Sequence, residues 1–331
     1  MLTTVPPCRQ HPVRARPGPS GPAERPFPGR ALSVGGRRVR RMTGLDRLLA
    51  LVPPPASPVG ADADWSRTER QLGLALPTDF TRTVRRYGDG VFCDDLYMYS
   101  PHHMAEINLG LLAGWSDMRE QWPEEVPYPL HPEPGGLVVW GGDSAGGALC
   151  WITEGEPDDW ETVHWQQRDG EFTPAGCGAP ELLARLLERR VAEAAEDCEE
   201  FDGPWFTPLR ERVHVCLRLT EGPLPYAERL RLLRERLAPV QLRGGWANPD
   251  GARQDHFAAT PSLWEITYET AYGHQIRITY PPAEEERVRT ELLAAVGAMG
   301  CSVESGLCLD RATEWPEFAG GGSGTGTAAK G

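Results

Sequence analysis

A glycine-rich loop between two apolar segments is the feature that most constrains the fold. Residues 137–140 have the pattern of a short apolar strand, and residues 148–153 that of a returning strand. Between them, residues 141–147 read Gly-Gly-Asp-Ser-Ala-Gly-Gly, and glycine tolerates the positive φ angles that a tight connection requires. The pattern predicts two neighbouring antiparallel strands.

Amphipathic helices are expected on both sides of this strand pair. Apolar residues recur at helical spacing, with proline or glycine at the ends, in residues 45–52, 64–73 and 77–87. Further strands are expected at 91–99, 162–166 and 171–173, and a leucine-rich helix follows Pro180. Helices, an antiparallel meander and a covering helix predict an α+β fold for residues 42–198.

Residues 212–318 are predicted to form a second, smaller α/β sandwich after a linker at 199–211. Val213, Val215, Leu217 and Leu219 alternate as in a half-buried strand. Helices are expected around residues 230–237 and 288–296, and strands at 264–268, 276–280 and 301–303. The expected order is β-α-β-β-β-α-β, in which residues are assigned to two of the three strands between the helices. This order is that of a ferredoxin-like sandwich with one extra strand.

The charge of the chain is unevenly distributed. The formal net charge is −13, but residues 1–41 hold nine arginines against Glu24 alone, which leaves −21 on the remainder. Because residues 42–331 are this acidic, they are expected to repel nucleic acid and to attract a basic partner. Residues 1–41 are expected to be a disordered basic extension or to precede the true start at Met42, and residues 319–331 to be a flexible tail.

The composition favours a cytoplasmic protein. No apolar run approaches the roughly 18 residues that a membrane span needs, and residues 1–41 lack the apolar stretch of a secretory signal. The eight cysteines form no CxxC pair and no zinc-finger spacing with histidine, so reduced thiols are expected. We expect no membrane association, no metal and no cofactor, and the oligomeric state stays open.

Residues 42–198 carry several motifs in a fixed order. They comprise Trp65, Glu69, Leu72, Gly73, Leu76, Pro77, Phe80, Tyr87, Gly88 and Gly90, followed by Gly142, Asp143, Gly146 and Gly147 in the glycine-rich loop. In order and spacing they resemble the SUKH superfamily, which joins fungal cell-wall-synthesis regulators and bacterial immunity proteins. We interpret nearly all of them as fold determinants rather than contact residues. A long insert at 110–134, rich in tryptophan and proline, departs from the family pattern and is either a partner loop or a surface elaboration.

The resemblance implies a protein-binding module rather than an enzyme. In bacteria such domains typically act as immunity proteins that block a cognate toxin. A regulatory scaffold, as the fungal relatives are thought to be, is one alternative.

A serine esterase is the other alternative. Residues 142–146 satisfy GxSxG and look like the nucleophile elbow of hormone-sensitive-lipase-type hydrolases, with Ser144 as nucleophile and Asp255 and His274 as possible partners. An elbow needs a helix after the serine and an upstream oxyanion segment. The sequence predicts a strand after Ser144 and contains no HGGG segment, so we disfavour this alternative.

An acidic loop between two predicted strands is the candidate binding site. It contains Glu154, Glu156, Asp158, Asp159, Trp160 and Glu161. Its carboxylates would steer a basic protein, such as a toxin, and the tryptophan would anchor it. A solvated loop without a partner is the alternative. A second group of acidic residues, within 193–202, fills the end of the predicted long helix and the linker. It is either a solvated face with a disordered hinge or a charged surface for a basic ligand.

Overall fold

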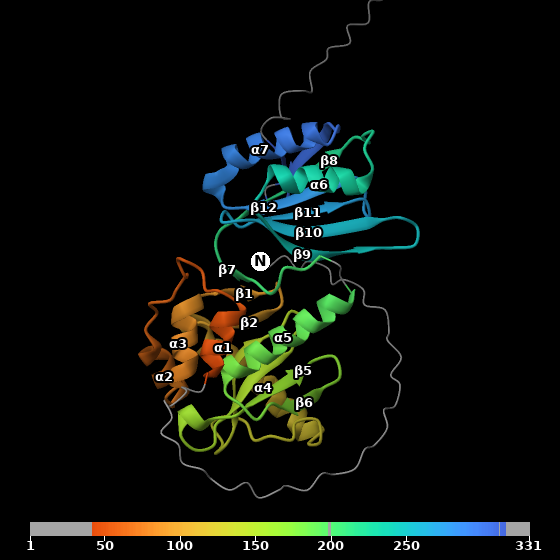
Figure 1. Ribbon diagram of the computed structural model, residues 1–331. Coiled ribbons are helices and arrows are strands. Elements are labelled where there is room, and N and C mark those ends of the chain that lie inside the picture. The colour runs from red at the N-terminus through yellow and green to blue at the C-terminus, as the bar shows by residue number, and fades with distance from the viewer. Residues whose placement is uncertain (1–41, 198–199, 311, 316–331) are drawn as a thin grey trace, which may run out of the picture. The chain divides into compact units, whose positions relative to one another are not determined.

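In the part of the chain that the structure describes, two seven-stranded antiparallel sheets and the helices packed against them form the fold. The computed structural model describes residues 42–197, 200–310 and 312–315 (Figure 1). The first sheet has the strand order β6-β5-β4-β3-β2-β1-β7, and the second has the order β14-β13-β8-β12-β11-β10-β9. The predicted α+β class is confirmed. The predictions for residues 1–41 and 319–331 lie outside the described residues.

The first sheet and its helices span residues 44–208. The helices are α1 Gly44–Leu51, α2 Trp65–Leu72, α3 Thr78–Tyr87, α4 Pro101–Gln121, α5 Ala179–Asp197 and the 3-10 turn η1 Pro157–Asp159. The strands are β1 Gly90–Phe92, β2 Leu96–Met98, β3 Leu137–Gly142, β4 Ala148–Ile152, β5 Thr162–Gln166, β6 Glu171–Pro174 and β7 Phe206–Pro208.

Strand β3 is buried along its whole length because the first sheet carries a core on each face. Neighbouring residues of a strand point to opposite faces. Val138 and Trp140 therefore join the core made with α1, α2, α3 and α5. Leu137 and Val139 join a second core that includes Leu112 and Trp115 of α4. This two-sided burial explains why the segment is continuously apolar.

The predicted N-terminal helices begin and end where the sequence indicates. In α1, Thr43 and Asp46 form a capping box. In α2, the Asp64 side chain accepts a hydrogen bond from the Ser66 amide, and Gly73 ends the helix in the left-handed region.

Helix α4 was missed by the sequence-based prediction, which assigned residues 110–134 to an insert. Its residue Asn108 is buried and completes the backbone pairing of β3 beyond the end of β2. The Asn108 side chain donates to the Val139 carbonyl at 2.8 Å and accepts from the Val139 amide at 2.7 Å. An asparagine side chain carries the same donor and acceptor groups as a peptide unit, so it replaces the absent strand neighbour. The segment is thus partly a structural helix.

Two other predictions need correction in the first half. The single strand expected at 91–99 is the hairpin β1–β2, which turns at Cys93 and Asp94, both with positive φ. Part of the expected linker is strand β7, which pairs with β1 at the edge of the first sheet. Phe206 of β7 packs against Tyr87 and Phe92 with ring centroids 5.2 and 4.8 Å apart, so the first core extends beyond residue 198.

The second sheet follows with two helices. Its strands are β8 Val213–Leu219, β9 Val240–Ala247, β10 Arg253–Ala259, β11 Trp264–Glu269, β12 Gln275–Tyr280, β13 Val303–Cys308 and β14 Thr313–Glu314. The helices are α6 Tyr226–Arg236 and α7 Glu285–Ala298, with the 3-10 turn η2 Pro282–Glu284 between β12 and α7. Both helices lie against the sheet (Figure 1). Their apolar residues form a single core with the alternating apolar residues of β8.

The topology of this sheet is close to the predicted one but has a longer meander. Strand β8 lies between β12 and β13, as the first strand of a ferredoxin-like sheet lies between the third and fourth. Four strands, β9 to β12, separate α6 from α7, where the sequence predicted three, and β14 extends the other edge. The last predicted strand, at 301–303, begins at Val303 and runs to Cys308.

Candidate partner-binding site

The glycine-rich loop is a tight hairpin between β3 and β4. The Asp143 carboxylate accepts hydrogen bonds from the amides of Gly147 at 2.8 Å and Ala145 at 3.0 Å, and contacts His164 Nε2 at 2.9 Å. Burial raises the pKa of Asp143, but the hydrogen bonds from His164 and the two amides outweigh it, so the pKa lies below its usual value. Gly146 has a φ of +89°, which favours glycine.

Ser144 does not have the surroundings of a hydrolase nucleophile. It lies in a loop between two strands, and its hydroxyl and amide both donate to Asp95, which also pairs with Arg190 of α5. Asp255 and His274, the possible partners, belong to the second half of the chain. Asp255 accepts from Tyr226 at 2.7 Å and from Arg234, while His274 contacts the Tyr268 hydroxyl at 2.9 Å. The three residues do not form a triad.

The acidic loop lies directly after β4 and contains η1. Glu154, Glu156, Asp159 and Glu161 are exposed, and within the described part of the chain their carboxylates form no ion pair. Asp158 is different, because its carboxylate accepts hydrogen bonds from the amide and hydroxyl of Thr78. It therefore fastens the loop to the start of α3.

The prediction that Trp160 anchors a partner is wrong for this structure. The indole is only 6% exposed and belongs to the first core, where its ring lies 6.0 Å from that of Trp151. Its Nε1 donates to the Gly155 carbonyl at 3.2 Å. Trp160 thus holds the acidic loop from inside, and the loop presents carboxylates without an exposed aromatic side chain.

The contacts that join the glycine-rich loop to α5 could not be predicted from the sequence. Asp95, His164 and Arg190 come from a turn, a strand and a helix, and they meet only at the glycine-rich loop. No spacing pattern joins residues so far apart in the chain. Their contacts bind the loop to β5 and to α5, which makes it a structural junction.

The family-motif residues support the first core and its turns. Trp65, Phe80 and Tyr87 are buried, and the Tyr87 hydroxyl donates to the Val52 carbonyl at 2.6 Å. Glu69 accepts the Leu76 amide at 3.1 Å and so fixes the turn between α2 and α3. Leu72 and Leu76 also lie in the core, and Pro77 directly precedes α3. A side chain at Gly88 would collide with Val59, and one at Gly90 would collide with Phe206.

A model of a known protein family matches part of the chain. The family model described as SMI1-KNR4 cell-wall, SUKH_6, matches residues 62–176. These residues are a SUKH-superfamily domain. The SUKH family is known for immunity proteins and SMI1-KNR4 regulators, which bind protein partners and are generally non-catalytic. No curated protein sequence matches the chain.

The first hydrophobic core includes residues on both sides of the matched range. Helix α1, helix α5 and strand β7 lie outside it, yet Leu48, Leu187 and Phe206 belong to the same core. Arg47 of α1 pairs with Glu181 and Glu188 of α5, which joins the two flanking helices. Among the described residues, no helix is long and apolar enough to cross a membrane.

Proposed function

We propose that this protein neutralises a basic protein toxin by stoichiometric binding in the cytoplasm, with no catalysis. The observation that supports this function is the acidic loop of the SUKH domain. It exposes Glu154, Glu156, Asp159 and Glu161 while Asp158 and Trp160 hold it in place. A fixed loop loses little conformational freedom on binding, so less of the binding energy is spent on ordering it.

The unpaired carboxylates act mainly on the rate of association. A negative patch attracts a basic protein over a distance set by the Debye length, about 8 Å at physiological salt. A toxin that acts on nucleic acid needs a basic surface for phosphates, and an acidic loop placed over that surface would block it. Association should therefore slow as the salt concentration rises.

Charge reversal tests the loop. Glu154, Glu156 and Asp159 are replaced together by lysine, which spares the structural Asp158. The matched control replaces Asp250, Glu286 and Glu304, three exposed acids of the second half, and changes the net charge equally. Proteins captured by the wild type are compared with those captured by each variant. A captured partner should be lost with the loop variant and kept with the control.

The captured partner is then tested for toxicity. Expressed alone in a bacterial host it should stop growth, and co-expression of the wild type or the control variant should restore growth. The loop variant should restore growth less, and surface plasmon resonance should show a slower association rate with weaker salt dependence. A regulatory scaffold would bind its partner without restoring growth. Full protection by the loop variant would contradict the proposed surface.

The non-catalytic part of the proposal has its own check. The purified protein should not hydrolyse p-nitrophenyl esters above background, because Ser144 donates to Asp95 and lies in a hairpin. Ester turnover that disappears in Ser144→Ala would contradict it.

A further inference from the structure

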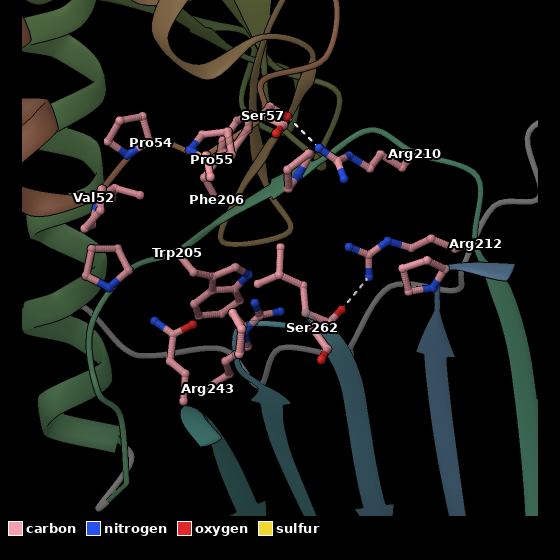
Figure 2. Close-up of a pocket in the computed structure, with 18 residues that line it drawn as sticks. Val52, Pro54, Pro55, Ser57, Trp205, Phe206, Arg210, Arg212, Arg243 and Ser262 are labelled. Carbon is pink, nitrogen blue, oxygen red and sulfur yellow. Dashed lines mark hydrogen bonds between the residues drawn. The ribbon is translucent and has the colours of Figure 1, made fainter. Parts of the chain in front are cut away.

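A cavity of about 410 Å³ is lined by prolines, a tryptophan and three arginines. It lies among residues 52–57, residues 204–212 and the segments around Arg243 and Leu263 (Figure 2). Its volume falls in the range of small-molecule sites, roughly 300–1,000 Å³. No acidic residue contributes to its lining. The cavity therefore combines apolar walls with donors of positive charge.

Arg243 is the buried cation of this cavity. Its side chain is only 4% exposed, and its guanidinium carbon lies 4.5 Å from the centroid of the Trp205 ring. Nη1 donates to Glu265 at 3.0 Å, but Nε and Nη2 are buried without a hydrogen-bond partner. Buried guanidinium nitrogens normally have acceptors, because leaving a charged donor unpaired costs free energy. The arginine thus has donor capacity for an anion.

The other two arginines add positive charge to the cavity. Arg212 is 10% exposed and contacts Glu265 at 3.1 Å and the Leu263 carbonyl at 3.2 Å. Arg210 is exposed and donates to the Ser57 carbonyl (Figure 2).

Carboxylates also lie close to these arginines. Glu265 is shared by Arg212, Arg243 and the Thr207 hydroxyl. Asp94 also lies near, and desolvation together with Glu265 raises its pKa.

We propose that this cavity binds a small organic anion, a carboxylate or phosphate attached to a flat apolar group. The anionic group would accept from Arg243 and Arg210, and the flat group would lie along Trp205 and the prolines. The Trp205 ring already holds the Arg243 guanidinium, which lowers the cost of ordering the donor when a ligand binds. A lone inorganic ion would satisfy the charge but leave most of the cavity unfilled. This inference does not rest on the proposed function, because it uses different residues.

Isothermal titration calorimetry with three small molecules tests whether the cavity binds an anion, in buffer free of phosphate and sulfate. Phenyl phosphate and benzoate carry the anion, and phenol is the neutral control of the same shape. At least one anion should give saturable binding to the full chain and raise its melting temperature, whereas phenol should do neither. Absence of saturable binding by both anions, or equal binding of phenol, would overturn the proposal.

Two variants assign the binding to the arginines. Arg243→Lys keeps the charge but loses the planar donors, and it should weaken binding about tenfold or more. Arg210→Gln removes an exposed charge and should also weaken binding. Arg231→Gln, an exposed arginine of α6 that pairs with Glu228 and Glu235, is the matched control. If Arg243→Lys does not fold, Arg210→Gln against the control decides. Unchanged affinity in the folded variants would place the anion elsewhere and overturn the assignment.

Discussion

The carboxylate of Asp158 accepts a hydrogen bond from the backbone amide of Thr78 at 2.6 Å. Thr78 is the first residue of α3, and the residue that precedes it, Pro77, provides no side-chain cap. An aspartate 80 positions further along the chain thus caps the helix. The same contact positions the acidic loop, so one carboxylate links helix stability to the geometry of the candidate binding surface.

Replacing Asp158 should therefore destabilise the fold, unlike replacing its exposed neighbour. Asp158→Ala is expected to lower the free energy of unfolding by about 1 kcal/mol, the usual effect of losing a helix cap. Asp159→Ala should change it by less than about 0.5 kcal/mol, as is usual for surface positions. Urea denaturation of the two variants measures the difference. Equal stabilities would contradict the capping role.

The glycines at the ends of α2 and α3 should differ in their tolerance of alanine. Both have positive φ, 71° at Gly73 and 69° at Gly88. A Cβ at Gly73 would meet nothing within 4 Å, whereas one at Gly88 would lie 2.1 Å from the Val59 carbonyl oxygen. Gly73→Ala should cost about 1 kcal/mol, the penalty for a left-handed alanine. Gly88→Ala should cost more and lower the melting temperature further. Equal melting temperatures would show that the backbone near Val59 yields easily.

Asp79 should make stability depend on pH. Burial raises its pKa, and the nearby Asp158 adds to the effect. Because the folded protein binds this proton more tightly, the associated stabilisation is complete below the ordinary aspartate pKa of about 3.9. It is lost as the pH rises through the higher folded-state value. The stability of the wild type relative to Asp79→Asn should therefore fall as the pH rises above about 4. Urea denaturation across this range checks it, and parallel curves would contradict it.

The division into two independently folding parts, with a boundary within residues 193–202, remains a prediction. Limited proteolysis should cut there and give two resistant fragments on a denaturing gel. Under native conditions the fragments should co-elute, because β7 would stay paired with β1 and Phe206 would stay packed on Tyr87 and Phe92. Phe206→Ala should weaken their association. A resistant fragment spanning residues 150–250 would mean that the two parts fold as one.

Much of the first half could be predicted from the sequence because its signals are local. Helices α1, α2 and α3 have caps, glycines and apolar spacing within a few residues of each other. The β3–β4 hairpin follows from its glycines and apolar flanks. Helix α4 lacked such signals, because Gly110 and Gly114 lower its helix propensity. Packing of Leu112 and Trp115 against the first sheet overrides that propensity, and only the folded chain provides it.

The sequence by itself determined the secondary-structure periodicity, the SUKH resemblance and the acidic character of the loop. Each follows from residue types at short spacing. Tertiary structure decided which loop residues are free, because exposure depends on neighbours that are distant in sequence. It buried Trp160 beside Trp151 and used Asp158 as the cap of α3. It also brought Arg210, Arg212 and Arg243 to one cavity. Local patterns cannot predict that meeting, since the path of the chain between β7 and β9 decides it.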